Sequence, residues 1–307
     1  MTYKFQGIEY KTPKVIVLDN TNMLFAEYFS RTAYDSFDKS ENEEVRLLDE
    51  YLNEDSGDLG SLLEEIKNND NPSSELMEQL SHVHFHKSTL EHIFFNISVK
   101  GISRALLQEL ARHRLASYTV RSTRYTMTDI LHNFLCIYRY SDKEAVLDIF
   151  IEYILNNRNY FTVSSESYLR IEAMNMALRL IYQLEQIGYN SFKELIVPKS
   201  LLEEFDSAET FDDAMSILKK KSKRNIGDPF KHIISENISV DLGLSINASS
   251  LKNMFELRLS GSAWFQFQVL MNEIYKQIPS NYMRLINNGK LDSIQQSVEA
   301  RINEGSF

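Results

Sequence analysis

The stretch from Arg104 to Arg124 carries the densest group of side chains that could do chemistry. It holds five arginines and a single acid, Glu109, and it contains Arg-His-Arg at 112–114, separated by seven residues from Ser122. The whole chain has 307 residues and a formal net charge of -10. Because arginine offers planar, forked donors that match pairs of phosphate oxygens, a local excess of arginine in an acidic protein predicts an anion-binding site.

Bulk composition narrows the classes of protein to which this chain can belong. Hydrophobic residues make up 43% and charged residues 25%, which is typical of a globular protein. No apolar run approaches the roughly 18–20 residues of a membrane span, and residues 1–6 lack the apolar core of a secretory signal. The acidic balance argues against general nucleic-acid binding, which needs a broad cationic face. We therefore expect a cytoplasmic protein with neither membrane nor nucleic-acid partners.

The single cysteine and the scattered glycines limit the mechanism further. One cysteine cannot form an internal disulfide, which fits a reducing compartment. Cys136 lies between Leu135 and Ile137, and burial among such residues raises the pKa of a thiol, so we interpret Cys136 as a packing residue. The ten glycines form neither a G-x-G-x-x-G run nor a P-loop. A bound nucleotide must therefore be held mainly by side chains.

Sequence patterns predict the elements that would position these side chains. Short β-branched and aromatic runs favour strands at 15–18 and at 93–99, the second ending at Gly101. Ser103 can cap a helix over 104–113, and residues 115–126 are expected to be extended. Alternating apolar and polar residues predict a strand over 238–246. Helical periodicity predicts further helices at 143–156, 166–187, 207–221, 249–259 and 262–278. The fold class is therefore α+β, with long helices around a modest mixed or antiparallel sheet.

Three alternating histidines suggest a different chemistry. On a strand, His82, His84 and His86 would share one face, which is a plausible arrangement for zinc. A further ligand or a catalytic carboxylate would have to come from elsewhere in the chain. This pattern leaves a zinc-dependent hydrolase as an alternative function.

Residues 247–258 form a second candidate anion site. They leave a predicted strand and enter a predicted helix, so Asn247 and free backbone N–H groups lie near a helix start that suits anions. Asn253 and Arg258 are five residues apart, which places them roughly 140° around a helix. We therefore expect these two side chains to contact different partners.

Four segments, in order along the chain, resemble the flavin-dependent thymidylate synthases. Arg-His-Arg at 112–114 followed by Ser122 matches the signature of that family. Residues 88–104 resemble the entry to its signature helix, residues 122–125 its nucleotide loop, and residues 247–258 its C-terminal strand and helix. The resemblance implies a single domain over 1–307 with the fold of the thymidylate synthase complementing proteins, and a helical insertion at about 140–225.

The resemblance also implies an activity, cofactors and partners. Members of this family methylate dUMP reductively to give dTMP. The carbon comes from 5,10-methylenetetrahydrofolate, and FAD reduced by NADPH is the source of hydride. Members are usually homotetramers whose active sites lie between subunits, so the expected partners are small molecules and further copies of this chain.

By position, the resemblance assigns two sets of binding residues and two catalytic residues. The expected FAD contacts are Ser88, Arg112, His113, Arg114, Asn247, Ser249 and Asn253. The residues expected around dUMP are Arg104, Glu109, Arg112, Arg121, Ser122, Thr123, Arg124, Lys231 and Arg258. Arg258 matches an arginine thought to favour ionisation at uracil N3, and His86 matches a histidine near the flavin. These two would be catalytic, and no metal is expected.

Three positions depart from the pattern of the family. Val120 stands where many members have glutamate, Lys231 where many have arginine, and Ser249 where an arginine is often found. Each change weakens a contact to flavin or nucleotide, although Lys231 can still meet a phosphate as a point charge. These departures leave a non-catalytic nucleotide-binding homologue as a second alternative.

Overall fold

The sheet consists of four strands that the sequence places far apart. The computed structural model describes residues 1–54, 58–220, 226–287, 289–305 and 307. In it the strands pair in the order β3-β4-β6-β5, with β3 antiparallel to β4. Their bounds are Lys14–Asn20 for β3, Phe94–Ser103 for β4, Ala116–Val120 for β5 and Ser239–Asn247 for β6. In β6 the side chains of Val240, Leu242, Leu244 and Ile246 are buried and alternate with less buried ones, as the sequence pattern predicts.

Two compact units divide the chain. Unit 1 comprises 1–11, 101–107 and 120–240, and unit 2 comprises 12–100, 108–119 and 241–307. Most of the sheet therefore belongs to unit 2. A separate antiparallel hairpin in unit 1 pairs β1, Thr2–Phe5, with β2, Ile8–Lys11.

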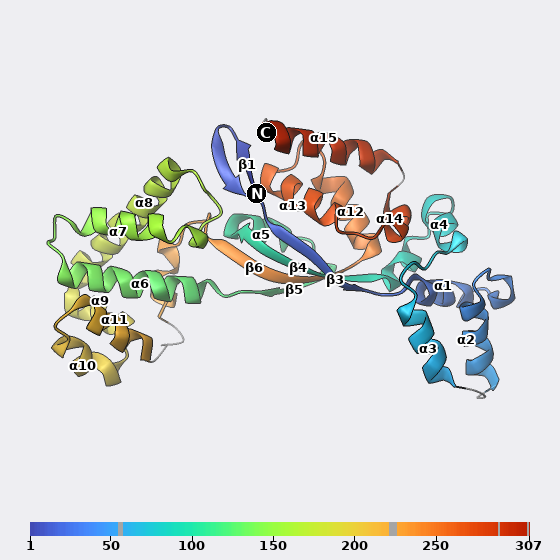
Figure 1. Ribbon diagram of the computed structural model, residues 1–307, viewed down its shortest axis with the longest axis horizontal. Helices are drawn as coiled ribbons and strands as arrows, with labels where there is room; N and C mark the ends of the chain where they lie inside the picture. The colour runs from blue at the N-terminus through green and yellow to red at the C-terminus, as the bar shows by residue number, and fades with distance from the viewer. Residues whose placement is uncertain (55–57, 221–225, 288, 306) are drawn as a thin grey trace. The chain divides into compact units, whose positions relative to one another are not determined.

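Helices from both ends of the chain build unit 2. The C-terminal helices are α12 (Ala248–Arg258), α13 (Phe265–Tyr275), α14 (Ser280–Ile286) and α15 (Lys290–Glu304). Helix α13 contacts β3 and both α12 and α15, and Figure 1 shows these orange and red helices along one face of the strands. The remaining helical segments of this unit are α1 (Met23–Thr32), η1 (Phe37–Lys39), α2 (Glu43–Glu54), α3 (Leu59–Asn68), α4 (Glu75–His82) and η2 (Lys87–His92).

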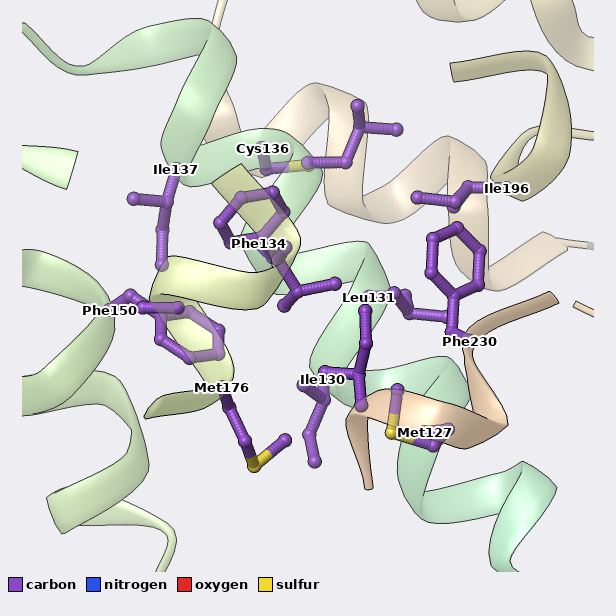
Figure 2. Close-up of a cluster of buried hydrophobic side chains, with 14 of the residues drawn as sticks. Met127, Ile130, Leu131, Phe134, Cys136, Ile137, Phe150, Met176, Ile196 and Phe230 are labelled. Carbon is purple, nitrogen blue, oxygen red and sulfur yellow. The ribbon is translucent and has the colours of Figure 1, made fainter. Parts of the chain in front are cut away.

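Unit 1 is a helical body around a large apolar core. Its helical segments are α6 (Thr123–Tyr140), α7 (Val146–Asn156), η3 (Arg158–Tyr160), α8 (Glu166–Ile187), α9 (Tyr189–Ile196), η4 (Lys199–Leu201), α10 (Leu202–Ser207), α11 (Phe211–Lys220) and η5 (Asp228–Ile233). Figure 2 shows the core, in which Phe134 of α6 meets Phe150 of α7 edge to face at 5.5 Å. Cys136 is fully buried in this core, which confirms its interpretation as a packing residue.

The structure confirms the α+β class and corrects several boundaries. Strand β4 does not end at Gly101, because this glycine adopts a φ of +82° that lets the strand bend and continue to Ser103. The predicted helix over 104–113 is shorter and forms α5, Arg104–Leu110. Residues 115–126 are not all extended, because Ser122 caps α6 through its Oγ, which accepts from the backbone N–H of Arg124 at 3.3 Å.

The predicted helices at 143–156, 166–187 and 207–221 correspond to α7, α8 and α11, although residue 221 lies outside the described residues. The predicted insertion at 140–225 likewise includes residues 221–225, which the structure does not describe. In the part of the chain that it does describe, no helix combines the length and apolar character needed to cross a membrane.

Candidate functional site

Local hydrogen bonds fix the turn that carries Arg-His-Arg. Ser103 Oγ accepts from the backbone N–H of Leu106 at 3.0 Å and so caps α5. At the other end of the helix, the Tyr118 hydroxyl donates to the carbonyl oxygens of Leu110, at 2.9 Å, and His113, at 3.0 Å. Burial raises the pKa of Tyr118 to about 12, so its hydroxyl keeps its proton. Strand β5 therefore holds the turn after α5 in one conformation.

A cationic cavity opens beside this turn in unit 2. Its volume is about 340 Å³, and it is lined by Lys87, Arg112, His113, Arg114, Leu115, Ile246, Ser249, Ser250 and Asn253. The described lining contains two arginines, a lysine and no carboxylate. Asn247 caps α12 next to the cavity, since its Oδ1 accepts from the backbone N–H of Ser250 at 2.7 Å. Side-chain cations and the start of an 11-residue helix therefore favour an anionic ligand.

Arg258, at the other end of α12, lies against the same turn. Its Nε donates to Nε2 of His113 at 3.1 Å, and its Nη2 lies 3.7 Å from the carboxylate of Glu109. The guanidinium also lies over the ring of Phe267, 4.7 Å from its centre. Burial, followed by the charges of Arg258 and Arg112, lowers the pKa of His113, so its imidazole is neutral and can accept.

A second polar cluster belongs to unit 1 and gathers expected substrate residues. Asp228 Oδ1 accepts from Nε of Arg124 at 3.0 Å and lies 2.9 Å from Nζ of Lys231. Lys231 and then Arg124 lower the pKa of Asp228, which keeps this carboxylate ionised. Nη1 of Arg104 donates to Thr123 Oγ1 at 3.4 Å. Arg124 and Lys231, more than a hundred residues apart in sequence, therefore share one counter-ion.

Glycine at position 227 allows this cluster to form. A Cβ atom placed at Gly227 would lie 3.3 Å from Cβ of Met127 and 3.5 Å from Cα of Arg124. A side chain here would have to displace its neighbours by a few tenths of an ångström, so glycine favours the close approach of η5 to α6. This approach brings Asp228 to Arg124.

His86 and Ser88 line a second cavity of unit 2, which differs from the one lined by Arg112–Arg114. It has a volume of about 560 Å³, and its further lining includes Phe29, Tyr34, His84 and His92.

The zinc hypothesis required a strand over 82–86, and this expectation is wrong because α4 ends at His82 and Phe85 has a φ of +55°. His82 instead contacts the carbonyl oxygen of Arg284 through Nε2. Among the described residues, no three or more His, Cys, Asp or Glu side chains are close enough to hold a metal.

Sequence reasoning missed four residues that the structure brings to these sites. Lys87 and Ser250 line the cavity, and the ring of Phe267 packs against Arg258. Asp228 accepts a hydrogen bond from Arg124. Lys87 is adjacent to Ser88 and Ser250 to Ser249, so a search of immediate neighbours could have found both. Asp228 stands three residues before Lys231, so the same search could have found it. Phe267 had no local signal, because it reaches Arg258 from a different helix.

The fold and the sites define an α+β protein with a cationic cavity suited to an anionic ligand. Comparison with known families makes the assignment specific. The chain belongs to the thymidylate synthase complementing protein family, whose sequence model matches residues 17–281. This match confirms the family predicted from the Arg-His-Arg segment.

Individual relatives agree with this assignment. The chain is 28% identical over 214 residues to a flavin-dependent thymidylate synthase of Helicobacter pylori, covering 69% of this chain and 79% of the relative. It is 25% identical over 269 residues to one of Campylobacter jejuni, covering 88% and 93%. A crystal structure of the Helicobacter pylori thymidylate synthase X with FAD and dUMP has a similar fold, with a TM-score of 0.53 and 23% identity, covering 90% of this chain and 98% of that one.

Proposed function

We propose that this protein is a flavin-dependent thymidylate synthase that converts dUMP to dTMP. Membership of the thymidylate synthase complementing protein family over residues 17–281 carries the proposal. The names of the relatives support FAD as the cofactor, and the solved relative contains both FAD and dUMP. 5,10-methylenetetrahydrofolate would supply the carbon and NADPH the reducing equivalents.

The cavity at the start of α12 fits the anionic part of a flavin dinucleotide. Its lysine and arginines can neutralise phosphates, and its serines and Asn253 can donate hydrogen bonds. The proposed FAD contacts are Ser88, Arg112, His113, Arg114, Asn247, Ser249 and Asn253, and we add Lys87 and Ser250. Lys87 supplies a positive charge to a cavity in which Ser249 supplies none.

The proposed dUMP contacts are Arg104, Glu109, Arg112, Arg121, Ser122, Thr123, Arg124, Lys231 and Arg258. A nucleotide phosphate can replace Asp228 as the counter-ion of Arg124 and Lys231, because its oxygens accept the same N–H donors. The Ser122 hydroxyl is proposed as a hydrogen-bonding group rather than a nucleophile.

Electrostatic stabilisation is the proposed role of Arg258. Uracil C5 must become nucleophilic, and a fixed cation beside the ring stabilises the negative charge that develops on it. When bound, the flavin supplies hydride chemistry, while the protein supplies position. No thiol is needed, in keeping with Cys136, whose pKa is raised by burial to about 12. His86 is the second proposed catalytic residue, at the wall of the 560 Å³ cavity.

The remaining expectations are part of the same proposal. The protein would act in the cytoplasm as a homotetramer with active sites between subunits. Residues 1–307 would form one functional domain in which about 140–225 are a helical insertion.

Purified protein tests the proposed function directly. It should be yellow or become yellow on addition of FAD, and it should release tritium from C5-labelled dUMP only when FAD, NADPH and methylenetetrahydrofolate are all present. A protein that cannot take up FAD would contradict the proposal. Tight dUMP binding without tritium release would favour the non-catalytic homologue instead.

Replacement of Arg258 tests its proposed role. Arg258→Ala should lower turnover by about 10²–10³-fold, the usual effect of removing a group that stabilises developing charge. The visible flavin spectrum should persist, since Arg258 is absent from the lining of the cavity. Arg170→Ala, which removes an exposed arginine from α8, is the matched control and should keep wild-type turnover. Turnover in Arg258→Ala equal to that of the control would remove this assignment.

A further inference from the structure

Arg258 is held on three sides by residues of α5, the following turn and α13. The ring of Phe267 covers the guanidinium at 4.7 Å, Nε2 of His113 accepts from Nε at 3.1 Å, and Glu109 lies 3.7 Å from Nη2. Among the residues that the structure describes, no hydrogen bond engages Nη1. These contacts fix the plane of the guanidinium and leave one N–H edge available to a ligand.

We propose that Phe267 and Glu109 are positioning residues that hold the Arg258 guanidinium, with its Nη1 edge free, for an anionic pyrimidine ring. The inference rests on the proposed function and deepens it. Glu109 then acts through Arg258, in addition to the substrate contact expected from the sequence.

Phe267 packs against both Arg258 and His113, the residue that accepts a hydrogen bond from Arg258. Its side chain is completely buried, and the ring of His113 packs edge to face on it at 5.6 Å with an interplanar angle of 83°. A buried ring has a fixed orientation, so it can set the orientation of both neighbours. Substitution by an aliphatic side chain would remove the cation–π contact and admit water beside the imidazole.

Glu109 balances the positive charges that meet at this turn. Its carboxylate lies 3.3 Å from Nη1 of Arg112 as well as 3.7 Å from Nη2 of Arg258. The carboxylate of Glu109 therefore offsets the repulsion between Arg112, which lines the cavity, and Arg258, which is proposed to be catalytic. Without it, Arg258 would lose the contact that fixes its Nη2.

His113 must be neutral for this arrangement to persist, because a protonated imidazole has no lone pair to accept from Arg258. The groups that face it are Arg258 from α12, Phe267 from α13, and Arg112 and Glu109 from the α5 segment. From β5, the hydroxyl of Tyr118 donates to the backbone carbonyl oxygen of His113 and not to its ring. Burial and the two arginines lower the pKa of His113, whereas Glu109 raises it.

Phe267→Leu and Glu109→Gln test the proposal through two readouts. The first is the titration midpoint of the His113 ring, followed by NMR on full-length protein without flavin or dUMP. It should move upward in Phe267→Leu, because water reaches the imidazole, and downward in Glu109→Gln, because a favourable negative charge is lost. The second is kcat for dTMP formation, which should fall about tenfold in each variant. In Phe267→Leu the flavin Kd should stay within about twofold of the wild type.

Phe95→Leu is the matched control, since it removes an equally buried ring from β4 that packs against Tyr282 instead of Arg258. It should leave kcat and the His113 midpoint unchanged. If Phe267→Leu behaves like this control in both readouts, the proposal is overturned. Phe267→Met, which keeps most of the volume without an aromatic ring, gives the same test should the leucine variant not fold. Midpoint shifts in the expected directions, in a protein whose wild type makes no dTMP, would contradict the proposed function and not this contact network.

Discussion

At the scale of single residues, the cavity beside α12 shows how charge can be supplied by an unexpected position. Ser249 lies at the start of this helix and carries no charge, yet the cavity remains cationic because Lys87 of η2 joins Arg112 and Arg114 in its lining. Lys87 also lies close enough to Lys252 to lower the pKa of that lysine, after the larger effect of burial. Glu256 opposes this effect on Lys252, whereas the described lining of the cavity holds three cations and no carboxylate, which favours an anionic ligand.

Lys87→Gln should weaken flavin binding about tenfold, because a charge-assisted contact to phosphate is lost while a polar side chain of similar size remains. Flavin fluorescence titration measures the Kd, and the variant should also show a weaker dependence on salt. Adding Ser249→Arg to Lys87→Gln should restore much of the affinity, since residue 249 lines the same cavity. Lys100→Gln, at an exposed lysine of β4, is the control. Equal Kd values in Lys87→Gln and this control would refute the assignment of Lys87.

At the scale of elements, α12 holds both ends of the candidate site. Asn247 caps its first turn, Asn253 lines the cavity, and Arg258 in its last turn meets His113. The expectation that Asn253 and Arg258 contact different partners stays a prediction, because His113 both lines the cavity with Asn253 and accepts from Arg258. Asn247 therefore has two expected effects: it stabilises the start of α12, and it lies beside the cavity.

Substitutions at Asn247 can separate these two effects. Asn247→Ala should lower the free energy of unfolding by about 1 kcal/mol, since the backbone N–H of Ser250 loses its acceptor. Asn247→Asp should keep the stability, because aspartate is an equally good cap, but it should weaken flavin binding by adding negative charge beside a cationic cavity. Urea unfolding and flavin titration check the two outcomes. If Asn247→Asp binds flavin as the wild type does, residue 247 has no part in the cofactor site.

At the scale of the whole molecule, the helical body of unit 1 contains a large apolar core of its own. His132 of α6 is 5% exposed, and burial followed by the charge of Lys219 lowers its pKa to about 4. The folded protein therefore holds this imidazole neutral under conditions in which an unfolded chain would protonate it. Stability consequently becomes dependent on pH through a residue that has no proposed part in catalysis.

The sign of this dependence follows from the lowered pKa. Below the ordinary pKa of about 6.5 the unfolded state binds one more proton than the folded state, so stability should fall as the pH drops toward 4. Between pH 6.5 and 5 the loss should be roughly 1.5 kcal/mol. Urea unfolding at both pH values should show a smaller loss for His132→Gln than for the wild type. His232→Gln, which removes an exposed histidine of the same unit, should keep the wild-type loss; identical slopes for all three proteins would contradict the prediction.

The sequence by itself determined the features that depend on neighbouring residues. Alternation predicted β6, the position of Ser103 predicted the start of α5, and the spacing of Arg-His-Arg and Ser122 predicted the family. These signals are local, because pleat, helical period and capping each act over a few residues. Local signals also misled, since three alternating histidines suggested a strand where α4 ends.

Only the tertiary structure decided which distant side chains meet. Arg258 contacts His113 across 145 positions of sequence, Arg124 contacts Asp228 across 104, and Phe267 covers Arg258 from the next helix. No periodicity encodes such contacts, because they follow from the path of the chain and from the packing of each helix on its neighbours. The residue types that could bind an anion were therefore evident from the sequence, whereas the partners that orient them depend on the folded chain.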